Sequence, residues 1–141
     1  MEARKIYVFT VVQIVVICLL LWFIFTMPGR WGWQRSLGTA LLIAGTGGIA
    51  VARYQLGRSF AIKAEANRLV THGVYSKIRN PIYLFGTVLI AGLVLLIHHP
   101  LLWLLVPAVI LMQMVRAHRE ARVLEAAFGD AYREYRRQTW F

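Results

Sequence analysis

The sequence is short of cysteine and of charged side chains, and each shortage excludes a class of protein. Its 141 residues include one cysteine, Cys18, which excludes an internal disulfide framework and a cysteine-rich zinc site. Charged residues make up 16% of the chain and hydrophobic residues 59%. A soluble domain has about 25% charged and about 45–50% apolar residues. Together with a mean hydropathy of +0.59, this composition predicts an integral membrane protein.

Acidic residues are scarce as well, with 6 Asp and Glu against 16 Lys and Arg and a formal net charge of +10. In a soluble protein such an excess suggests a nucleic-acid partner. In a membrane protein it indicates cytoplasmic loops rich in Lys and Arg. Because the chain is so apolar, we expect a membrane partner and no nucleic acid.

Four apolar runs have the composition of membrane-crossing helices, and we expect a single all-α membrane domain built from them. They cover residues 6–27, 36–54, 81–97 and 101–115, with a polar connector over 55–80. The first run is longer than the core of a signal peptide, about 7–15 residues, so we expect it to be retained as a helix. The last two runs are separated only by His98-His99-Pro100, which predicts a tight antiparallel hairpin.

Two further patterns concern how these helices pack and end. The second run carries small residues at every fourth position, which predicts a flat face for another helix: Ala40, Ala44, Gly48 and Ala52. In the fourth run we expect Pro107 to kink the helix. Beyond it, we expect residues 116–138 to form an amphipathic helix, interrupted at Gly129. Its apolar and aromatic stripe consists of Ala121, Leu124, Phe128, Tyr132 and Tyr135.

The positions of the cations predict the orientation of the four spans. Only Arg30 and Arg35 lie at the connection between the first two runs, and the other Lys and Arg residues fall on the opposite side. Because cytoplasmic segments are enriched in Lys and Arg, we expect both termini and the 55–80 connector in the cytoplasm. We expect a multi-pass protein of a prokaryotic cytoplasmic membrane.

Two polar segments flank the predicted hairpin on this cytoplasmic side. The first, from Leu69 to Tyr83, has the pattern Leu-Val-x-x-Gly-x-Tyr-x-x-x-Arg-Asn-Pro-x-Tyr. The second, from Arg116 to Tyr135, has the pattern Arg-x-x-x-Glu-x-x-x-Leu-x-x-x-Phe-Gly-x-x-Tyr-x-x-Tyr. In this order around a short hairpin, they resemble the integral membrane methyltransferases. That family includes the isoprenylcysteine carboxyl methyltransferases and the phospholipid N-methyltransferases.

The resemblance implies a fold, a cofactor and a set of site residues. It implies S-adenosylmethionine as methyl donor, held on the cytoplasmic side, and a lipid or prenyl-type acceptor that enters from the bilayer. The resemblance implies catalytic roles for Arg116 and Glu120. The residues implied to bind the cofactor are Gly73, Tyr75, Arg79, Asn80, Pro81, Tyr83 and Glu120. The chain departs from the family at Asn80, where many members have His, and at Ala121, where many have a second Glu.

Each polar candidate also has a purely structural interpretation. Glu120 lies four residues after Arg116, so the two could pair on one helix surface. Arg116 could also extend its charged end to the membrane surface. Asn80 precedes Pro81 and could cap a helix, and Tyr75 and Tyr83 could be interfacial aromatic residues.

Other functions remain open from the sequence. The leading interpretation is an enzyme like the isoprenylcysteine carboxyl methyltransferases, and the first alternative is a phospholipid N-methyltransferase acting on an ethanolamine-type amine. A non-catalytic membrane scaffold, binding partner helices through its small-residue face, is the alternative from another class. A reductase is a weaker alternative. Because His98 and His99 lie on the far side of the membrane from the motif, we expect no metal site. Neither the acceptor nor the oligomeric state follows from the sequence.

Overall fold

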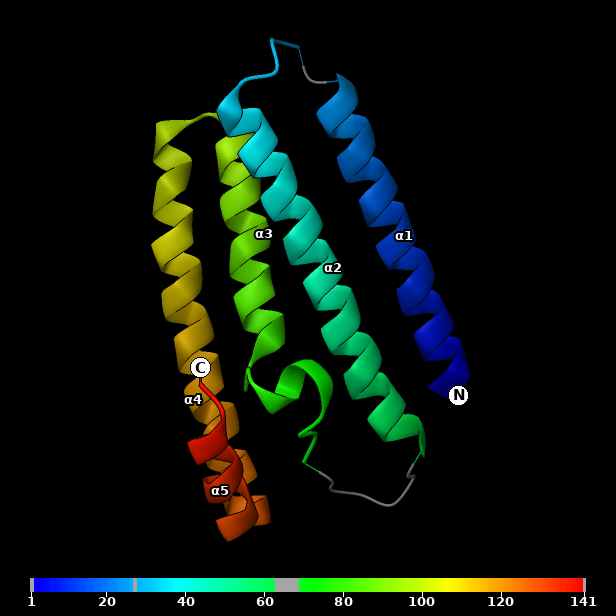
Figure 1. Cartoon of the computed structure of the whole chain (residues 1–141), viewed down its shortest axis with the longest axis vertical. Helices are drawn as coiled ribbons and strands as arrows, with labels where there is room; N and C mark the ends of the chain where they lie inside the picture. Colours follow the sequence, from blue (N-terminus) through cyan, green and yellow to red (C-terminus); the bar gives the residue numbers. More distant parts are fainter. Residues whose placement is uncertain (1, 27, 63–68, 141) are drawn as a thin grey trace.

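The computed structural model describes residues 2–26, 28–62 and 69–140, and this part of the chain is helical. Four long helices account for most of it: α1 (Glu2–Thr26), α2 (Trp33–Ile62), α3 (Pro81–Ile97) and α4 (Leu105–Phe128). Three short elements complete it: the 3₁₀ turns η1 (Gly73–Ser76) and η2 (Pro100–Leu104), and helix α5 (Asp130–Gln138). In Figure 1, α3 lies between α2 and α4, and α1 lies on the outer side of α2.

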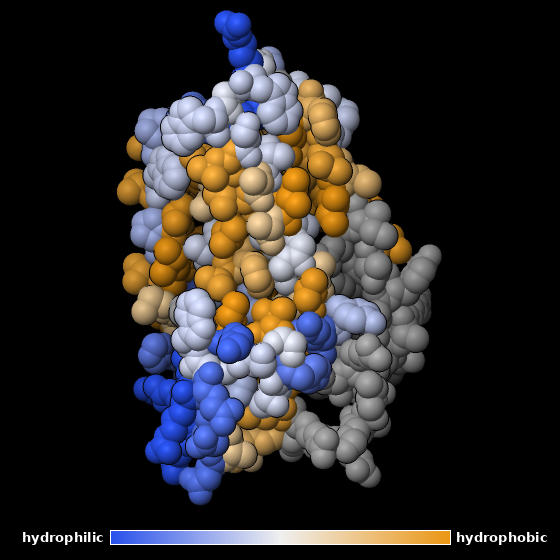
Figure 2. Space-filling model, viewed as in Figure 1, coloured by the Kyte–Doolittle hydropathy of each residue, from blue (hydrophilic) through white to orange (hydrophobic). Residues whose placement is uncertain are grey.

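Two helical segments are long and apolar enough to cross a membrane, Trp33–Gly57 and Pro100–Phe128. Two shorter apolar helical segments, Val15–Thr26 and Pro81–Ile97, lie beside them in the sequence. Figure 2 shows an apolar belt across the middle of the visible face, with hydrophilic residues at both ends. Both features are those of a membrane protein.

The closest helix contact is between α2 and α3, whose backbones touch at glycines. A Cβ atom added to Gly45 would lie 2.6 Å from the backbone nitrogen of Leu89. One added to Gly92 would lie 2.8 Å from the carbonyl oxygen of Gly38. No side chain fits at either position, and this close approach is how helices associate when lipid surrounds them.

The predicted small-residue face of α2 is wrong at two of its four positions. Ala52 is fully buried and Gly48 faces the ring of Phe85, but Ala40 and Ala44 are exposed. An α-helix has 3.6 residues per turn, so a stripe at every fourth residue drifts around the helix. The face that contacts α3 follows a shorter repeat and includes Gly38, Leu42, Gly45 and Ala52.

Several predicted boundaries also need correction. Helix α2 continues to Ile62, well past residue 54, which shortens the connector. Residues 100–104 form η2 rather than α-helix, and α4 begins at Leu105. Pro107 therefore lies in the first turn of α4, where its missing N–H costs no hydrogen bond, and not at a kink within the helix.

Helix α4 runs through the predicted boundary at residue 116 and ends at Phe128. Gly129 follows with a φ of +53°, a backbone conformation that favours glycine, and α5 begins at the next residue. This confirms the predicted interruption. Tyr132 and Tyr135 of α5 are buried, as the aromatic stripe predicts.

Candidate functional site

Segments far apart in the sequence meet at one end of the molecule. The turn η1, the first turn of α3, the second half of α4 and α5 lie together there, at the end where the chain terminates (Figure 1). This region contains all the residues of the two-part motif. The chain's remaining turns, between α1 and α2 and between α3 and α4, lie at the opposite end.

Tyr83 and Glu120 connect the two halves of the motif directly. The hydroxyl of Tyr83, in the first turn of α3, donates a hydrogen bond to Oε1 of Glu120 on α4. A helix-surface pair between Glu120 and Arg116 is not among the ion pairs of the described residues. Arg116 instead lies close enough to act electrostatically on the Tyr83 hydroxyl. The site thus places one carboxylate, one phenol and one guanidinium together.

Tyr75 shares this electrostatic environment from the 3₁₀ turn η1. Its side chain is 8% exposed. Burial raises the pKa of the Tyr75 hydroxyl, the positive charge of Arg53 lowers it, and the negative charge of Glu120 raises it. Arg53 belongs to α2, so a third long helix contributes a charge to the site. Arg53 was not predicted as a site residue, because in the sequence it is one of many cations that indicate the orientation of the spans.

The turn that carries Tyr75 is fixed by α2. The backbone N–H of Val74 donates to Oε1 of Gln55 at 2.9 Å. Gly73 has a φ of +63°, and a Cβ there would lie 2.4 Å from the same Gln55 oxygen. Gly73 therefore meets both a conformational and a steric requirement of this turn. Gln55 was missed because the sequence predicts that α2 ends just before it.

Asn80 and Pro81 begin α3, but the Asn80 side chain makes no cap hydrogen bond. Its backbone carbonyl accepts from the N–H groups of Tyr83 and Leu84, each at 3.1 Å. The expected side-chain cap is therefore wrong, and the amide of Asn80 is not used by the helix. Pro81 is buried at the helix start, where proline fits without losing a hydrogen bond.

The C-terminal segment covers the loop that carries the first half of the motif. The hydroxyl of Tyr135 donates to the backbone carbonyl of Tyr75 at 2.8 Å, and both groups are buried. Further along, the N–H of Trp140 donates to the carbonyl of Lys77 at 3.1 Å, and the N–H of Arg79 donates to the carbonyl of Trp140 at 3.5 Å. We call Tyr135, Thr139 and Trp140 the C-terminal clasp.

The clasp also gathers charge around Tyr135. The pKa of the Tyr135 hydroxyl is raised to about 12, mainly by burial and also by the neighbouring Tyr75, against the positive charge of Arg79, which lowers it. Arg79 therefore lies near the aromatic pair of α5, whereas Arg116 lies near Tyr83 and Glu120. The two arginines of the motif occupy different parts of the site.

A polar pair that the sequence analysis missed lies one helical turn further along α3. Oγ1 of Thr87 donates to Oε1 of Gln113 at 2.8 Å and is 3.1 Å from the carbonyl of Tyr83. Gly86 leaves space beside Gln113, since a Cβ there would be 3.4 Å from its Nε2. Gln113 is the one amide in an otherwise apolar run, a signal of function that the sequence offers.

His72 directly precedes η1 and His118 lies on α4, both within the segments that carry the motif, whereas the other two histidines lie far from it. His98 and His99 lie at the α3–α4 turn, and the Nδ1 of His118 contacts the carbonyl of Met114 at 2.9 Å. Within the described ranges no three His, Cys, Asp or Glu side chains are grouped so that they could hold a metal ion. The side chains of this region supply one carboxylate, three guanidinium groups, three tyrosine hydroxyls and three amides: Glu120; Arg53, Arg79 and Arg116; Tyr75, Tyr83 and Tyr135; and Gln55, Asn80 and Gln113.

A comparison with known families supports the resemblance seen in the motif. The family model described as phospholipid methyltransferase matches residues 33–131, which is well over half of the chain. No curated protein and no solved structure matches the chain significantly. The matched segment contains α2, α3, α4 and the start of α5, with the first half of the motif and the second half except Tyr132 and Tyr135. The chain belongs to the phospholipid methyltransferase family.

Proposed function

We propose that this protein is a multi-pass membrane methyltransferase that uses S-adenosylmethionine and acts on a lipophilic acceptor. The observation that carries the proposal is the hydrogen bond from Tyr83 to Glu120, because it unites the two halves of the motif in one polar site at the end of a helix pair. Helices α1 to α4 cross the bilayer in this proposal. The excess of Lys and Arg at the site's end of the molecule supports a cytoplasmic position for the site.

The residues of the site fit the groups of this donor. S-adenosylmethionine supplies an activated methyl group on a sulfonium and also carries an ammonium, a carboxylate and an adenosine. Glu120 accepts from Tyr83 through one oxygen, and its second oxygen suits the ammonium or the ribose hydroxyls. Arg79 or Arg116 suits the carboxylate, since a guanidinium binds it with two parallel hydrogen bonds. The Asn80 amide, unused by α3, suits a further polar atom of the donor.

The aromatic residues of the site, Tyr75 buried and Tyr83 half-buried, would exclude water and hold the adenosine. Tyr75 is buried under the C-terminal clasp, and Tyr83 stands in the first turn of α3. Methyl transfer is an in-line displacement in which the thioether leaves without a proton. The protein's contribution is therefore largely positioning and the exclusion of water.

Two classes of acceptor fit, and they require different chemistry. A carboxylate, as in an isoprenylcysteine, would attack without losing a proton and needs only a cation such as Arg116 to hold it. An ethanolamine-type amine must first lose a proton, and Glu120 is the carboxylate placed to receive it. The description of the matched family names a phospholipid, with which the amine alternative is equally consistent. Activity that rises with pH would identify the amine, and a flat profile the carboxylate.

The proposal is tested first by donor binding. In Glu120→Gln the amide oxygen can still accept from Tyr83, but the negative charge is lost. Since hydrogen bonds to charged groups contribute about 1.5–3 kcal/mol, we expect S-adenosylhomocysteine to bind about tenfold more weakly or worse, measured by calorimetry in detergent. The matched control is Glu134→Gln, which removes the same charge from an exposed position on α5.

Two results would contradict the proposal. One is no detectable binding of S-adenosylhomocysteine by the unsubstituted protein in several detergents and lipids. The other is equal binding by the Glu120 and Glu134 variants, which is what a non-catalytic scaffold predicts. Incubation with labelled S-adenosylmethionine and total lipid extract, followed by mass spectrometry, identifies the acceptor.

A further inference from the structure

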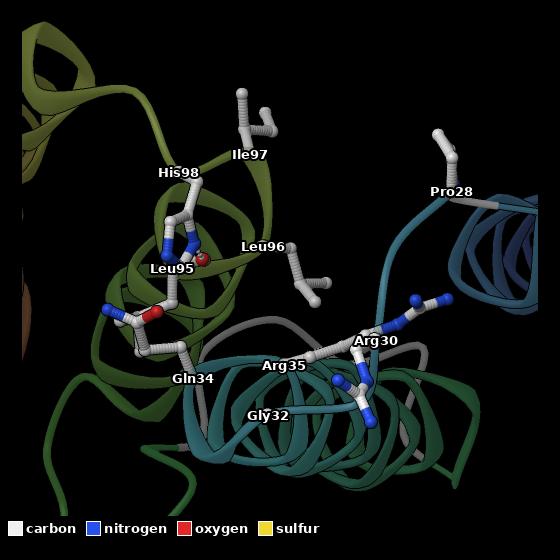
Figure 3. A pocket seen from close by; sticks show the side chains of 9 residues that line it. All are labelled: Pro28, Arg30, Gly32, Gln34, Arg35, Leu95, Leu96, Ile97 and His98. Atoms are coloured by element: carbon white, nitrogen blue, oxygen red, sulfur yellow. Dashed lines mark hydrogen bonds between the residues drawn. The ribbon is translucent and has the colours of Figure 1, made fainter.

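A cavity of about 370 Å³ lies at the end of the molecule opposite to Glu120. It is bounded by the turn between α1 and α2, the first residues of α2 and the last residues of α3 (Figure 3). Its floor is apolar and includes Leu95 and Leu96, whereas its rim carries Arg30, Arg35 and His98. No part of the methyl-transfer motif lies here.

The rim is positively charged, and its own segments contain no acid to balance the charge. Residues 28–35 and 95–100 include two arginines and no Asp or Glu. Among the described residues, Arg30 has neither an ion pair nor a side-chain hydrogen bond. Arg30 is exposed and Arg35 is half-buried, so an anion from outside the chain can approach this positive charge.

Arg35 is held in place with donors to spare. Its Nη1 donates to the carbonyl of Gly29 at 3.1 Å, its Nη2 donates to the carbonyl of Ile24, and its guanidinium lies 4.6 Å from the ring of Trp31. Its Nε is enclosed and has no hydrogen-bond partner among the described residues. Carbonyl oxygens orient the group but leave its charge in full. Of the five N–H donors of a guanidinium, two are used here and the Nε–H is enclosed, so one donor on Nη1 and one on Nη2 remain for an anion.

The level of this cavity in a bilayer that the protein crosses indicates which anion would lie next to it. The apolar segment of α2 that is long enough to cross a membrane begins at Trp33. Trp31 and Trp33 are both exposed, and tryptophan is enriched where the hydrocarbon meets the headgroups. The cavity therefore lies at the level of lipid phosphates, with its apolar floor towards the acyl chains.

We propose that this cavity binds the phosphate group of a membrane phospholipid, with Arg30 and Arg35 as its ligands. Arginine suits phosphate because its planar fork matches two phosphate oxygens. The apolar floor at Leu95 and Leu96 then accommodates the first carbons of the acyl chains. The site is independent of the methyl-transfer site, since the two lie at opposite ends of the molecule.

The test is lipid retention in native mass spectrometry, on the whole protein in a neutral, phosphate-free detergent. Three ligands are compared: phosphatidylglycerol, the diacylglycerol with the same chains and no phosphate, and inorganic phosphate. The variant is Arg30→Gln, because Arg35 also holds the α1–α2 turn and its loss would disturb the fold. Arg136→Gln, at an exposed position on α5, is the control with the same change of charge.

We expect phosphatidylglycerol to bind the unsubstituted protein and the Arg136 variant about fivefold more tightly than the Arg30 variant, as one cation near a lipid headgroup predicts. Diacylglycerol should bind all three weakly and equally. Equal retention of phosphatidylglycerol by the Arg30 and Arg136 variants overturns the proposal, as does equal retention of the two lipids. Arg30-dependent binding of inorganic phosphate that displaces the lipid assigns the cavity to the free ion and also overturns it. Binding of S-adenosylhomocysteine, measured in parallel, should be unchanged in the Arg30 variant.

Discussion

Removal of one hydroxyl, in Tyr135→Phe, should loosen the C-terminal clasp from the loop that carries Tyr75. The Tyr135 side chain is 6% exposed, and its hydroxyl donates to the Tyr75 carbonyl at 2.8 Å. Phenylalanine fills the same space but leaves that buried carbonyl without this donor. A buried polar group that loses its partner costs about 1–3 kcal/mol, which is more than a typical net hydrogen bond contributes.

This cost acts locally, because few other contacts hold the clasp. Beyond Tyr135, the two hydrogen bonds between Trp140 and the 77–79 segment are the backbone contacts that keep the end of the chain in place. Since about 1.4 kcal/mol changes an equilibrium tenfold, the open population should rise about fivefold to a hundredfold. Donor binding should weaken in the same direction, because Tyr75 loses its cover.

Hydrogen exchange measures this opening directly. The amides of Arg79 and Trp140 should lose protection in Tyr135→Phe by the factor given above, whereas amides in the middle of α2 and α3 should not change. Tyr54→Phe is the control, because it removes the same hydroxyl from a side chain that is 63% exposed. If the Arg79 and Trp140 amides exchange equally in the two variants, the hydrogen bond to Tyr75 does not hold the clasp and the reasoning is refuted.

Two further substitutions test the turn η1 and the polar pair between α3 and α4. Gly73→Ala forces alanine into a φ of +63° and against Gln55, so it should lower stability by about 1–2 kcal/mol in thermal unfolding and weaken donor binding. Gly57→Ala, in open space on α2, should not lower it. Gln113→Leu should cost only about 0.6 kcal/mol, because Thr87 keeps its bond to the Tyr83 carbonyl. A loss above about 3 kcal/mol would show that Gln113 has a larger structural role.

The sequence predicts helix positions well where residues of special geometry bound them. Pro81 begins α3, and His98 ends it with a φ of +60°, so the predicted range 81–97 matches the observed helix. The continuation of the fourth helix past residue 115 was predicted and is confirmed by α4, but the predicted range of α2 was too short, because the change from apolar to polar composition marks a change of surroundings. It does not mark the end of a helix, whose backbone hydrogen bonds form equally well in both media.

The sequence predicts only part of the candidate site, because the site depends on helix ends and on helix register, which composition does not mark. Tyr83 and Glu120 were both selected from the motif, but their contact spans 37 residues and depends on the register between α3 and α4. Gln55 was not selected, because its role requires α2 to continue beyond residue 54. Thr139 and Trp140 of the clasp lie beyond the motif, so neither spacing nor resemblance indicated their role.

The packing of α2 also bears on the choice between an enzyme and a scaffold. A scaffold would need its small-residue face free for partner helices. In the structure Gly48 of that face is covered by the ring of Phe85 on α3 and Ala52 is buried, whereas Ala40 and Ala44 are exposed. The neighbouring glycines that contact α3, Gly38 and Gly45, have backbone contacts too close to admit a second helix there. A bulky residue at Gly45 would therefore disturb the fold itself, whatever the function. What this packing achieves is to fix α3 against α2, and so to hold Tyr83 in a constant position relative to Arg53 and Gln55. A rigid frame around a polar site is what positioning catalysis requires.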